Sequence, residues 1–152
     1  MHQLLTSTTL LTPIIDMSAL NDPTVSYYRW YSNDQGAAPN ADVFVIEISN
    51  NGGSSWSLVE SVGPDGSGTA GGWIQNVFRV SSVVTPTSQM RMRFIASDLG
   101  SGSIVEAAID DFEVADVSAI TTTLIANPEA HQPTEDQIKA AEKKADAAAQ
   151  PA

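Results

Sequence analysis

Three aspartates near the end of the most strongly alternating part of the sequence are of the residue type that binds metal ions. Asp98 precedes a glycine–serine turn, and the adjacent Asp110 and Asp111 lie toward the end of the strand predicted after it. Carboxylates and turn carbonyls are the hard oxygen ligands that Ca²⁺ prefers, and a formal net charge of -11 favours cations. The spacing is not that of an EF-hand loop, so the alternative is that Asp110 or Asp111 hydrogen-bonds backbone amides at a bend.

A second group of candidates consists of charged and aromatic residues that lie inside predicted strands rather than in loops. Charges in the middle of a strand either pair with neighbouring strands or line a face that meets a polar ligand. Flat aromatic side chains beside them can stack on sugar rings or fill protein interfaces, and each can equally pack into a core. The predicted ligand-binding residues are Tyr28, Arg29, Trp30, Trp73, Arg93 and Glu106.

Catalytic chemistry is restricted by the residues that this sequence lacks or confines to its ends. The chain has no cysteine, both histidines lie in the terminal segments, and every lysine follows Asn127. The usual bases and nucleophiles are therefore missing from the body of the chain, which leaves only carboxylate chemistry. A glycosidase pair could be drawn from Glu47, Glu60, Glu106 and Asp110, against the alternative of solvated or arginine-paired carboxylates. We predict that the chain is not an enzyme.

Alternating apolar residues predict the antiparallel strands that must position these side chains. The predicted strands are 24–32, 42–49, 56–62, 73–80, 90–96 and 105–114, with a hairpin turn at 50–53 and loops at 33–41 and 63–72. In the last strand Ile109 and Phe112 have opposite parity. A straight strand would therefore push one of them into water, so a β-bulge or bend is predicted at Asp110 and Asp111. The expected fold class is an all-β antiparallel sandwich.

The composition changes after residue 117, which divides the chain into a predicted sandwich domain, 1–117, and a linker with a polar tail, 118–152. The tail is rich in alanine, lysine and glutamate, and a capping-box pattern beginning at Thr134 predicts a helix. Ile138 is the only large apolar residue of that helix, so we expect a short solvated helix or a disordered tail. The acidic charge disfavours nucleic acid and anionic lipid as partners, and no apolar segment is long enough to span a membrane.

Several segments together resemble the MAM-like and galactose-binding-like jelly-roll modules of secreted bacterial proteins, over about residues 10–114. The most specific are SNNGGSSW at 49–56 and VEAAIDD at 105–111. Modules of this kind are often attached to metallopeptidases or to enzymes that act on glycans. The resemblance implies a jelly-roll sandwich that serves as a non-catalytic accessory module and contacts carbohydrate or another polar extracellular ligand. The alternative is a structural, adhesion or protein-interaction module.

The sequence departs from the family pattern at two places, and each departure leads to a prediction. The usual aspartate of the hairpin is replaced by Asn51, which weakens the inference of a metal in that turn. Modules of this type normally begin with a further strand, so we expect the chain to lack the N-terminal part and to expose a sheet edge open to homo-association. The first residues show no signal peptide. The resemblance nevertheless implies an extracellular or cell-surface location.

Overall fold

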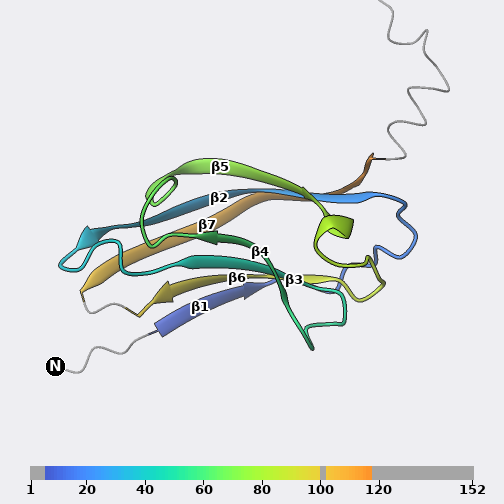
Figure 1. Ribbon diagram of the computed structural model, residues 1–152, viewed down its shortest axis with the longest axis horizontal. Coiled ribbons are helices and arrows are strands. Elements are labelled where there is room, and N and C mark those ends of the chain that lie inside the picture. Colours follow the sequence, from blue (N-terminus) through green and yellow to red (C-terminus); the bar gives the residue numbers. More distant parts are fainter. Residues whose placement is uncertain (1–5, 100–101, 118–152) are drawn as a thin grey trace, which may run out of the picture. The chain divides into compact units, whose positions relative to one another are not determined.

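The computed structural model describes residues 6–99 and 102–117, which form two antiparallel β-sheets packed face to face (Figure 1). One sheet has the strand order β1-β6-β3-β4 and the other has the order β5-β2-β7. The predicted all-β sandwich is confirmed, and the jelly-roll connectivity stays a prediction. The elements are β1 (Thr6–Leu11), β2 (Pro23–Gly36), β3 (Phe44–Ser49), β4 (Ser57–Val62), β5 (Ala70–Arg79), the 3-10 turn η1 (Val80–Ser82), β6 (Arg91–Asp98) and β7 (Ser103–Asp116).

Strands β1 and β2 differ from the sequence-based expectation, and β5 begins at Ala70, within residues predicted to form a loop. Strand β1 was not predicted, because its residues are threonine-rich and do not alternate between apolar and polar; it forms by pairing antiparallel with β6. Strand β2 continues to Gly36 through residues whose composition predicted a loop. Its extension is stabilised by pairing of Gln35 with Ile104 and of Gly36 with Ser103 in β7. Pairing with a neighbouring strand therefore overrides local composition at both positions.

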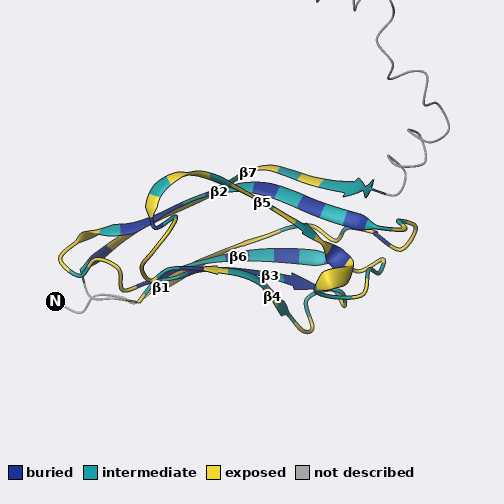
Figure 2. Ribbon diagram, turned by 45° about the horizontal axis from the view of Figure 1, so that its top comes forward, coloured by how far each residue is buried: buried dark blue, intermediate teal, exposed yellow. Residues whose placement is uncertain are grey.

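The core lies between the sheets and follows the two-residue period of the strands. From Pro23 to Tyr31 every second residue of β2 is buried, a pattern visible as alternating dark blue and teal bands in Figure 2. Tyr31 of β2 stacks on Phe44 of β3, with ring centroids 5.5 Å apart. Tyr27 meets Phe94 of β6 edge to face at 5.4 Å. Aromatic contacts that join a strand of one sheet to a strand of the other thus hold the two layers together. The buried apolar residues are Met17, Val25, Tyr27, Tyr31, Phe44, Ile46, Ile48, Val62, Val80, Met90, Met92 and Phe94.

The β-bulge predicted in the last strand is confirmed. The register between β2 and β7 shifts so that Ser26 pairs with Glu113 while Tyr28 pairs with Asp110. Asp111 adopts a φ of 48°, in the left-handed region, and its N–H donates to Asp110 Oδ1 at 2.8 Å. The extra residue turns the strand so that the apolar side chains on both sides of the bulge pack against the core.

The chain divides into two units, Met1–Val117 and Ser118–Ala152. The predicted linker and polar tail fall in the second unit and lie outside the described residues. Within residues 6–99 and 102–117, no helix has the length and apolar character needed to cross a membrane.

Substitution of Asp111 tests the left-handed backbone of the bulge. We expect Asp111→Val to lower the free energy of unfolding by about 1–2 kcal/mol, because a β-branched residue clashes with its own backbone at positive φ. Asp111→Gly should change it by no more than about 0.5 kcal/mol, since glycine accepts this conformation. Denaturant unfolding measures both. The matched control is Glu113→Val, at an exposed position of the same strand outside the bulge; an equal loss in the two valine variants would contradict the assignment.

Candidate functional site

The predicted ligand-binding residues do not form one site, because they lie on three different surfaces of the sandwich. Tyr28, Trp30, Trp73 and Glu106 lie on the outer face of the three-stranded sheet. Arg29 belongs to the opposite parity of β2 and is buried between the sheets, 6% exposed. Arg93 lies on the outer face of the four-stranded sheet, beside Glu47 of β3. The aromatic residues therefore share a surface, and the two arginines do not belong to it.

The shared surface has a defined cross-strand arrangement. Trp30 is directly opposite Trp73 of β5, and on its other side it is opposite Ala108 of β7. Two residues further along β2, Tyr28 lies between an amide and a carboxylate on the neighbouring strands. Directly opposite residues of an antiparallel pair have Cβ atoms about 4.5–5.5 Å apart, so these side chains form one patch. We call this patch the aromatic face; it comprises Tyr28, Trp30, Trp73, Gln75, Glu106 and Asp110.

The two tryptophans of the aromatic face differ in accessibility for a local structural reason. Trp73 is 52% exposed. Trp30 is half-buried, because its ring lies against the backbone at Gly71. A Cβ built at Gly71 would lie 2.8 Å from Trp30 Cζ2, and Gly71 has a φ of 81°, so glycine is required here on both counts. The glycine-rich segment before Trp73 therefore positions the Trp30 ring across the face.

A shallow depression continues the aromatic face toward the bulge. Its volume is about 340 Å³, and its lining is mostly polar. The bulge contributes to the depression, because Asp111 and Phe112, which lie where the register of β7 shifts, are among its lining residues. The depression places carboxylate, amide and hydroxyl groups next to an aromatic ring, a combination suited to a ligand with both hydroxyl groups and apolar faces. The lining residues are Ser26, Tyr28, Gln75, Asp111, Phe112 and Glu113.

Arg29 takes part in a polar cluster inside the sandwich. Its Nε and Nη2 atoms both lie 2.8 Å from Oε1 of Glu60, on β4 of the opposite sheet. The other oxygen of Glu60 accepts hydrogen bonds from the Tyr27 hydroxyl at 3.1 Å and from Asn76 Nδ2 at 2.8 Å. The carboxylate thus receives donors from β2 and β5. Arg29 is committed to this internal bridge and is not available to a ligand on the aromatic face.

Arg93 is also paired within the protein. Its Nε donates to Glu47 Oε2, and its guanidinium lies over the ring of Trp56, 4.4 Å from the centroid. This arrangement of carboxylate, guanidinium and indole lies on the outer face of the four-stranded sheet. A cation over an indole ring is attracted by the negative face of that ring. Arg93 therefore stabilises its own sheet and is separated from the aromatic face by the whole thickness of the sandwich.

The three aspartates of the calcium hypothesis do not form one group, because Asp98 lies apart from Asp110 and Asp111. Asp98 ends β6 near Ser103, whose Oγ lies 2.9 Å from Asp98 Oδ1 and 2.6 Å from Oδ2 of the buried Asp42. Asp110 and Asp111 lie at the bulge, seven or more residues further along β7, which corresponds to about 23 Å. Within the described ranges no group of three histidine, cysteine, aspartate or glutamate side chains could hold a metal ion. The pairing of Asp110 with the bulge amide favours the capping interpretation, and Ca²⁺ binding stays a prediction.

The four carboxylates considered for a glycosidase pair also lie on different surfaces. Glu60 is internal, Glu47 is on the outer face of the four-stranded sheet, and only Glu106 and Asp110 share a face. Those two are four residues apart on one strand, which separates their Cα atoms by about 13 Å. Retaining and inverting glycosidases hold their carboxyl groups about 5–9.5 Å apart. The spacing along the strand thus differs from that of a glycosidase pair.

Several residues of these sites were not singled out from the sequence. Gln75 completes the aromatic face, and its alternation with Trp73 was a usable signal, because residues two apart on a strand share a face. Asn76 donates a hydrogen bond to Glu60 in the interior, and Asp42 accepts one from the backbone N–H of Leu99. Nothing in their local sequence distinguishes them from solvent-exposed polar residues, since their roles depend on segments far away in the chain.

Two buried tyrosines have side-chain pKa values raised well above the ordinary value. Burial, reinforced by the Asp42 carboxylate and partly offset by Asn33, raises the pKa of Tyr31 to about 12. Burial together with the adjacent Glu60 carboxylate raises the pKa of Tyr27 still further. Both hydroxyls are therefore protonated under ordinary conditions, and that of Tyr27 donates to Glu60.

No protein-family model matches the chain, and a search of the curated proteins returns no match.

The Arg29–Glu60 bridge gives a prediction for stability. We expect Glu60→Leu to lower the free energy of unfolding by about 3–5 kcal/mol, because it leaves a buried guanidinium without its counter-charge. The double variant Arg29→Met/Glu60→Leu should recover a large part of that loss. The control is Glu47→Leu, which leaves the more exposed Arg93 and should cost about 1 kcal/mol or less. Equal losses for Glu60→Leu and Glu47→Leu in denaturant unfolding would contradict an internal bridge.

The tyrosine shifts predict how stability changes at alkaline pH. An ordinary tyrosine has a pKa of about 10, so in the unfolded chain Tyr27 and Tyr31 release their protons first. The contribution of the protonated Tyr31 hydroxyl to the free energy of unfolding is therefore complete below about pH 10, and it is lost as the pH rises through about 12. Tyrosinate absorbance of the native protein near pH 11 should therefore fall well below that of the chain in denaturant, whereas equal absorbance would show that the two hydroxyls are accessible.

Proposed function

We propose that this chain is a non-catalytic accessory binding module of a secreted or cell-surface protein, and that its aromatic face binds carbohydrate. The observation that carries the proposal is the cross-strand pair of Trp30 and Trp73 on the outer face of the sheet, with Trp73 52% exposed. Large exposed aromatic side chains cost solvation free energy unless a ligand covers them. Their rings offer flat apolar surfaces of the size of a pyranose ring.

The polar neighbours of the two tryptophans support a sugar rather than a purely apolar ligand. Gln75 and Asp110 flank Tyr28 on both sides, and Glu106 follows on β7. Carboxylates accept hydrogen bonds from hydroxyl groups, while an amide both donates and accepts, so these side chains can satisfy the hydroxyls at the rim of a sugar ring. The carboxylates also disfavour acidic polysaccharides. We therefore expect neutral glycans to bind in preference to uronic-acid polymers.

A structural or protein-interaction module is the second candidate, and one observation favours it. The mid-strand charges Arg29 and Arg93 are both paired within the chain, with Glu60 and Glu47, rather than directed to a ligand. Internal pairs of this kind fix the register of strands and the spacing of sheets. They account for the arginines, but they leave the outward-facing tryptophan pair without a role.

Substitution of the exposed tryptophan tests the proposed function. Native affinity electrophoresis in gels that contain xylan, mixed-linkage β-glucan, galactomannan or pectate should show retardation of the full-length protein by at least one neutral polysaccharide. Trp73→Ala should weaken that interaction about ten-fold or more, because it removes the most exposed stacking surface. Leu58→Ala is the matched control, since Leu58 is 58% exposed on the opposite sheet and its loss should leave retardation unchanged.

Two results would count against carbohydrate binding at this face. One is an absence of retardation in all of the gels, combined with an absence of signal on a glycan array. The other is retardation that Trp73→Ala and Leu58→Ala reduce equally, which would indicate a general surface effect. Either result would leave the structural or protein-interaction module as the better account.

A further inference from the structure

The two sheets are unequal in width, and the difference lies on one side of the sandwich. Phe94 of β6 meets Phe112 of β7 across the interior, with ring centroids 6.4 Å apart, so these two strands face each other. Beyond them the four-stranded sheet continues to β1, whereas among the described strands the other sheet ends at β7. We call the side that carries β1 and β7 the open side. The sandwich has room there for one more strand, beside β7 and above β1.

The exposure of β1 shows the consequence of this unequal width. Leu10 pairs directly with Phe94, so it points to the inner face of its sheet, toward the core. It is nevertheless 56% exposed, and all six residues of β1 are exposed. An inward-facing leucine is normally covered by the opposite sheet. Here the covering strand is missing among the described residues.

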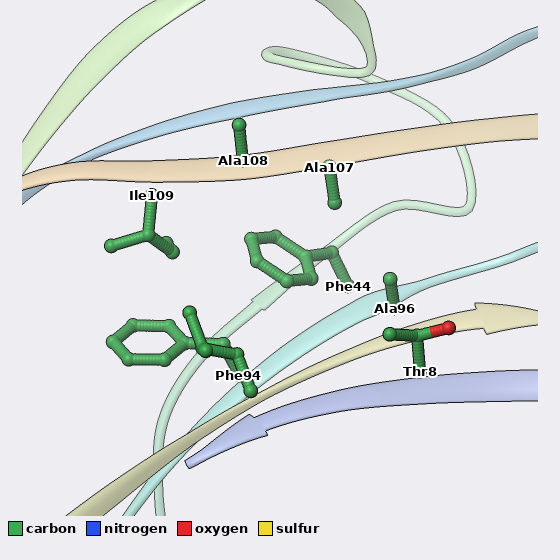
Figure 3. A pocket seen from close by; sticks show the side chains of 8 residues that line it. Thr8, Phe44, Phe94, Ala96, Ala107, Ala108 and Ile109 are labelled. Atoms are coloured by element: carbon green, nitrogen blue, oxygen red, sulfur yellow. The ribbon is translucent and has the colours of Figure 1, made fainter. Parts of the chain in front are cut away.

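An apolar groove of about 80 Å³ runs along the open side. Figure 3 shows Ala107 and Ile109 pointing from β7 toward Phe44 and Phe94 on the other sheet, with the rings forming the floor. Short side chains on both walls leave the space unfilled. The only polar side chain in the lining is that of Thr8. The lining residues are Thr8, Leu10, Phe44, Phe94, Ala96, Ala107, Ala108 and Ile109.

The charge along β7 limits what can add beside it. Exposed Glu106, Asp110 and Glu113 point from the outer face of β7, and the strand carries no lysine or arginine. An added strand would place its outward side chains directly next to these carboxylates. Basic side chains at those positions would be attracted and acidic ones repelled. The inward side chains of the same strand would lie over Leu10 and the groove, so they must be apolar.

We propose that the open side is a docking site for an extended segment of a partner polypeptide that alternates apolar with basic residues and adds as a fourth strand beside β7. Backbone hydrogen bonds to the edge of β7 bind the segment, the groove takes its apolar side chains, and the β7 carboxylates pair with its basic ones. A second copy of this chain is less suitable, because antiparallel pairing of two β7 strands would bring like carboxylates together.

A short end-capped peptide, TVKVKVT, labelled with fluorescein, is the probe. Titration of the full-length protein should raise its fluorescence anisotropy with a saturating curve. The peptide TVEVEVT, which keeps the alternation but reverses the charge, should bind about ten-fold more weakly or worse. The isomer TVVKKVT keeps the charge but breaks the alternation, so it cannot place valines inward and lysines outward together, and it should also bind about ten-fold more weakly.

The variant Leu10→Asp distinguishes binding in the groove from general electrostatic attraction. The added negative charge alone would strengthen binding of a basic peptide, so a loss of about ten-fold or more can come only from the groove. Leu58→Asp adds the same charge at an exposed site on β4 and should change the affinity by no more than about two-fold. Trp73→Ala should leave peptide binding unchanged, which keeps this test independent of the proposed carbohydrate site.

Three outcomes would overturn the proposal. Binding that is equal for TVKVKVT and TVVKKVT would show simple charge attraction. Affinity that Leu10→Asp leaves unchanged or improves would exclude the groove as the site. Light scattering that shows a stable dimer, converted to monomer by Leu10→Asp, would identify a second copy of the chain as the occupant in place of a basic partner.

Discussion

The two-residue period of β2 is the constraint on which the rest of the structure depends. β2 is the central strand of its sheet, paired with β5 on one side and β7 on the other. Pairing on both edges fixes its register, and the register determines which residues lie on each face. One parity supplies Tyr27, Arg29 and Tyr31 to the interior, and the other supplies Tyr28 and Trp30 to the outer face. A slip of one residue would exchange these sets and place a tryptophan in the core and an arginine in water. The buried cluster and the aromatic face are thus two consequences of a single register.

The interior holds a charged residue of β2 because Glu60 of the opposite sheet supplies its counter-charge, although Nη1 of Arg29 has no hydrogen-bond partner among the described residues. Glu60 receives the guanidinium of Arg29 on one oxygen and two neutral donors on the other, so little of its hydrogen-bonding capacity is unused. Such a cluster adds little net stability compared with a well-packed apolar core, but it permits only one relative position of the sheets. It closes the side of the sandwich formed by β4 and β5. The groove on the side formed by β1 and β7 is lined mainly by apolar side chains instead.

The sequence predicts those features that depend on parity within one segment. Alternation of apolar residues within each strand predicted that Ile46 and Phe94 are core positions. The parity change between Ile109 and Phe112 predicted the bulge. What it could not predict depends on which strands are neighbours. Arg29 and Trp30 are adjacent in sequence and so lie on opposite faces of β2, but the partner that neutralises the internal arginine, Glu60, lies 31 residues away in the chain. β1 was not predicted for the same reason, because its residues do not alternate between apolar and polar and it forms by pairing with β6. The candidate site was therefore predictable in its aromatic part and not in its charged part.

The proposed sugar surface and the proposed strand-docking edge share one element, β7, and this sharing has a thermodynamic consequence. The carboxylates of Glu106 and Asp110 border the aromatic face, and they would also lie next to the outward side chains of a strand added at the open side. A carboxylate that is paired with a lysine has fewer free lone pairs for sugar hydroxyls. Binding free energies are reciprocal, so whatever a docked basic strand does to sugar affinity, the sugar must do equally to the affinity of the strand. If both sites are occupied in the intact protein, β7 couples them, and competition for its carboxylates makes the coupling negative.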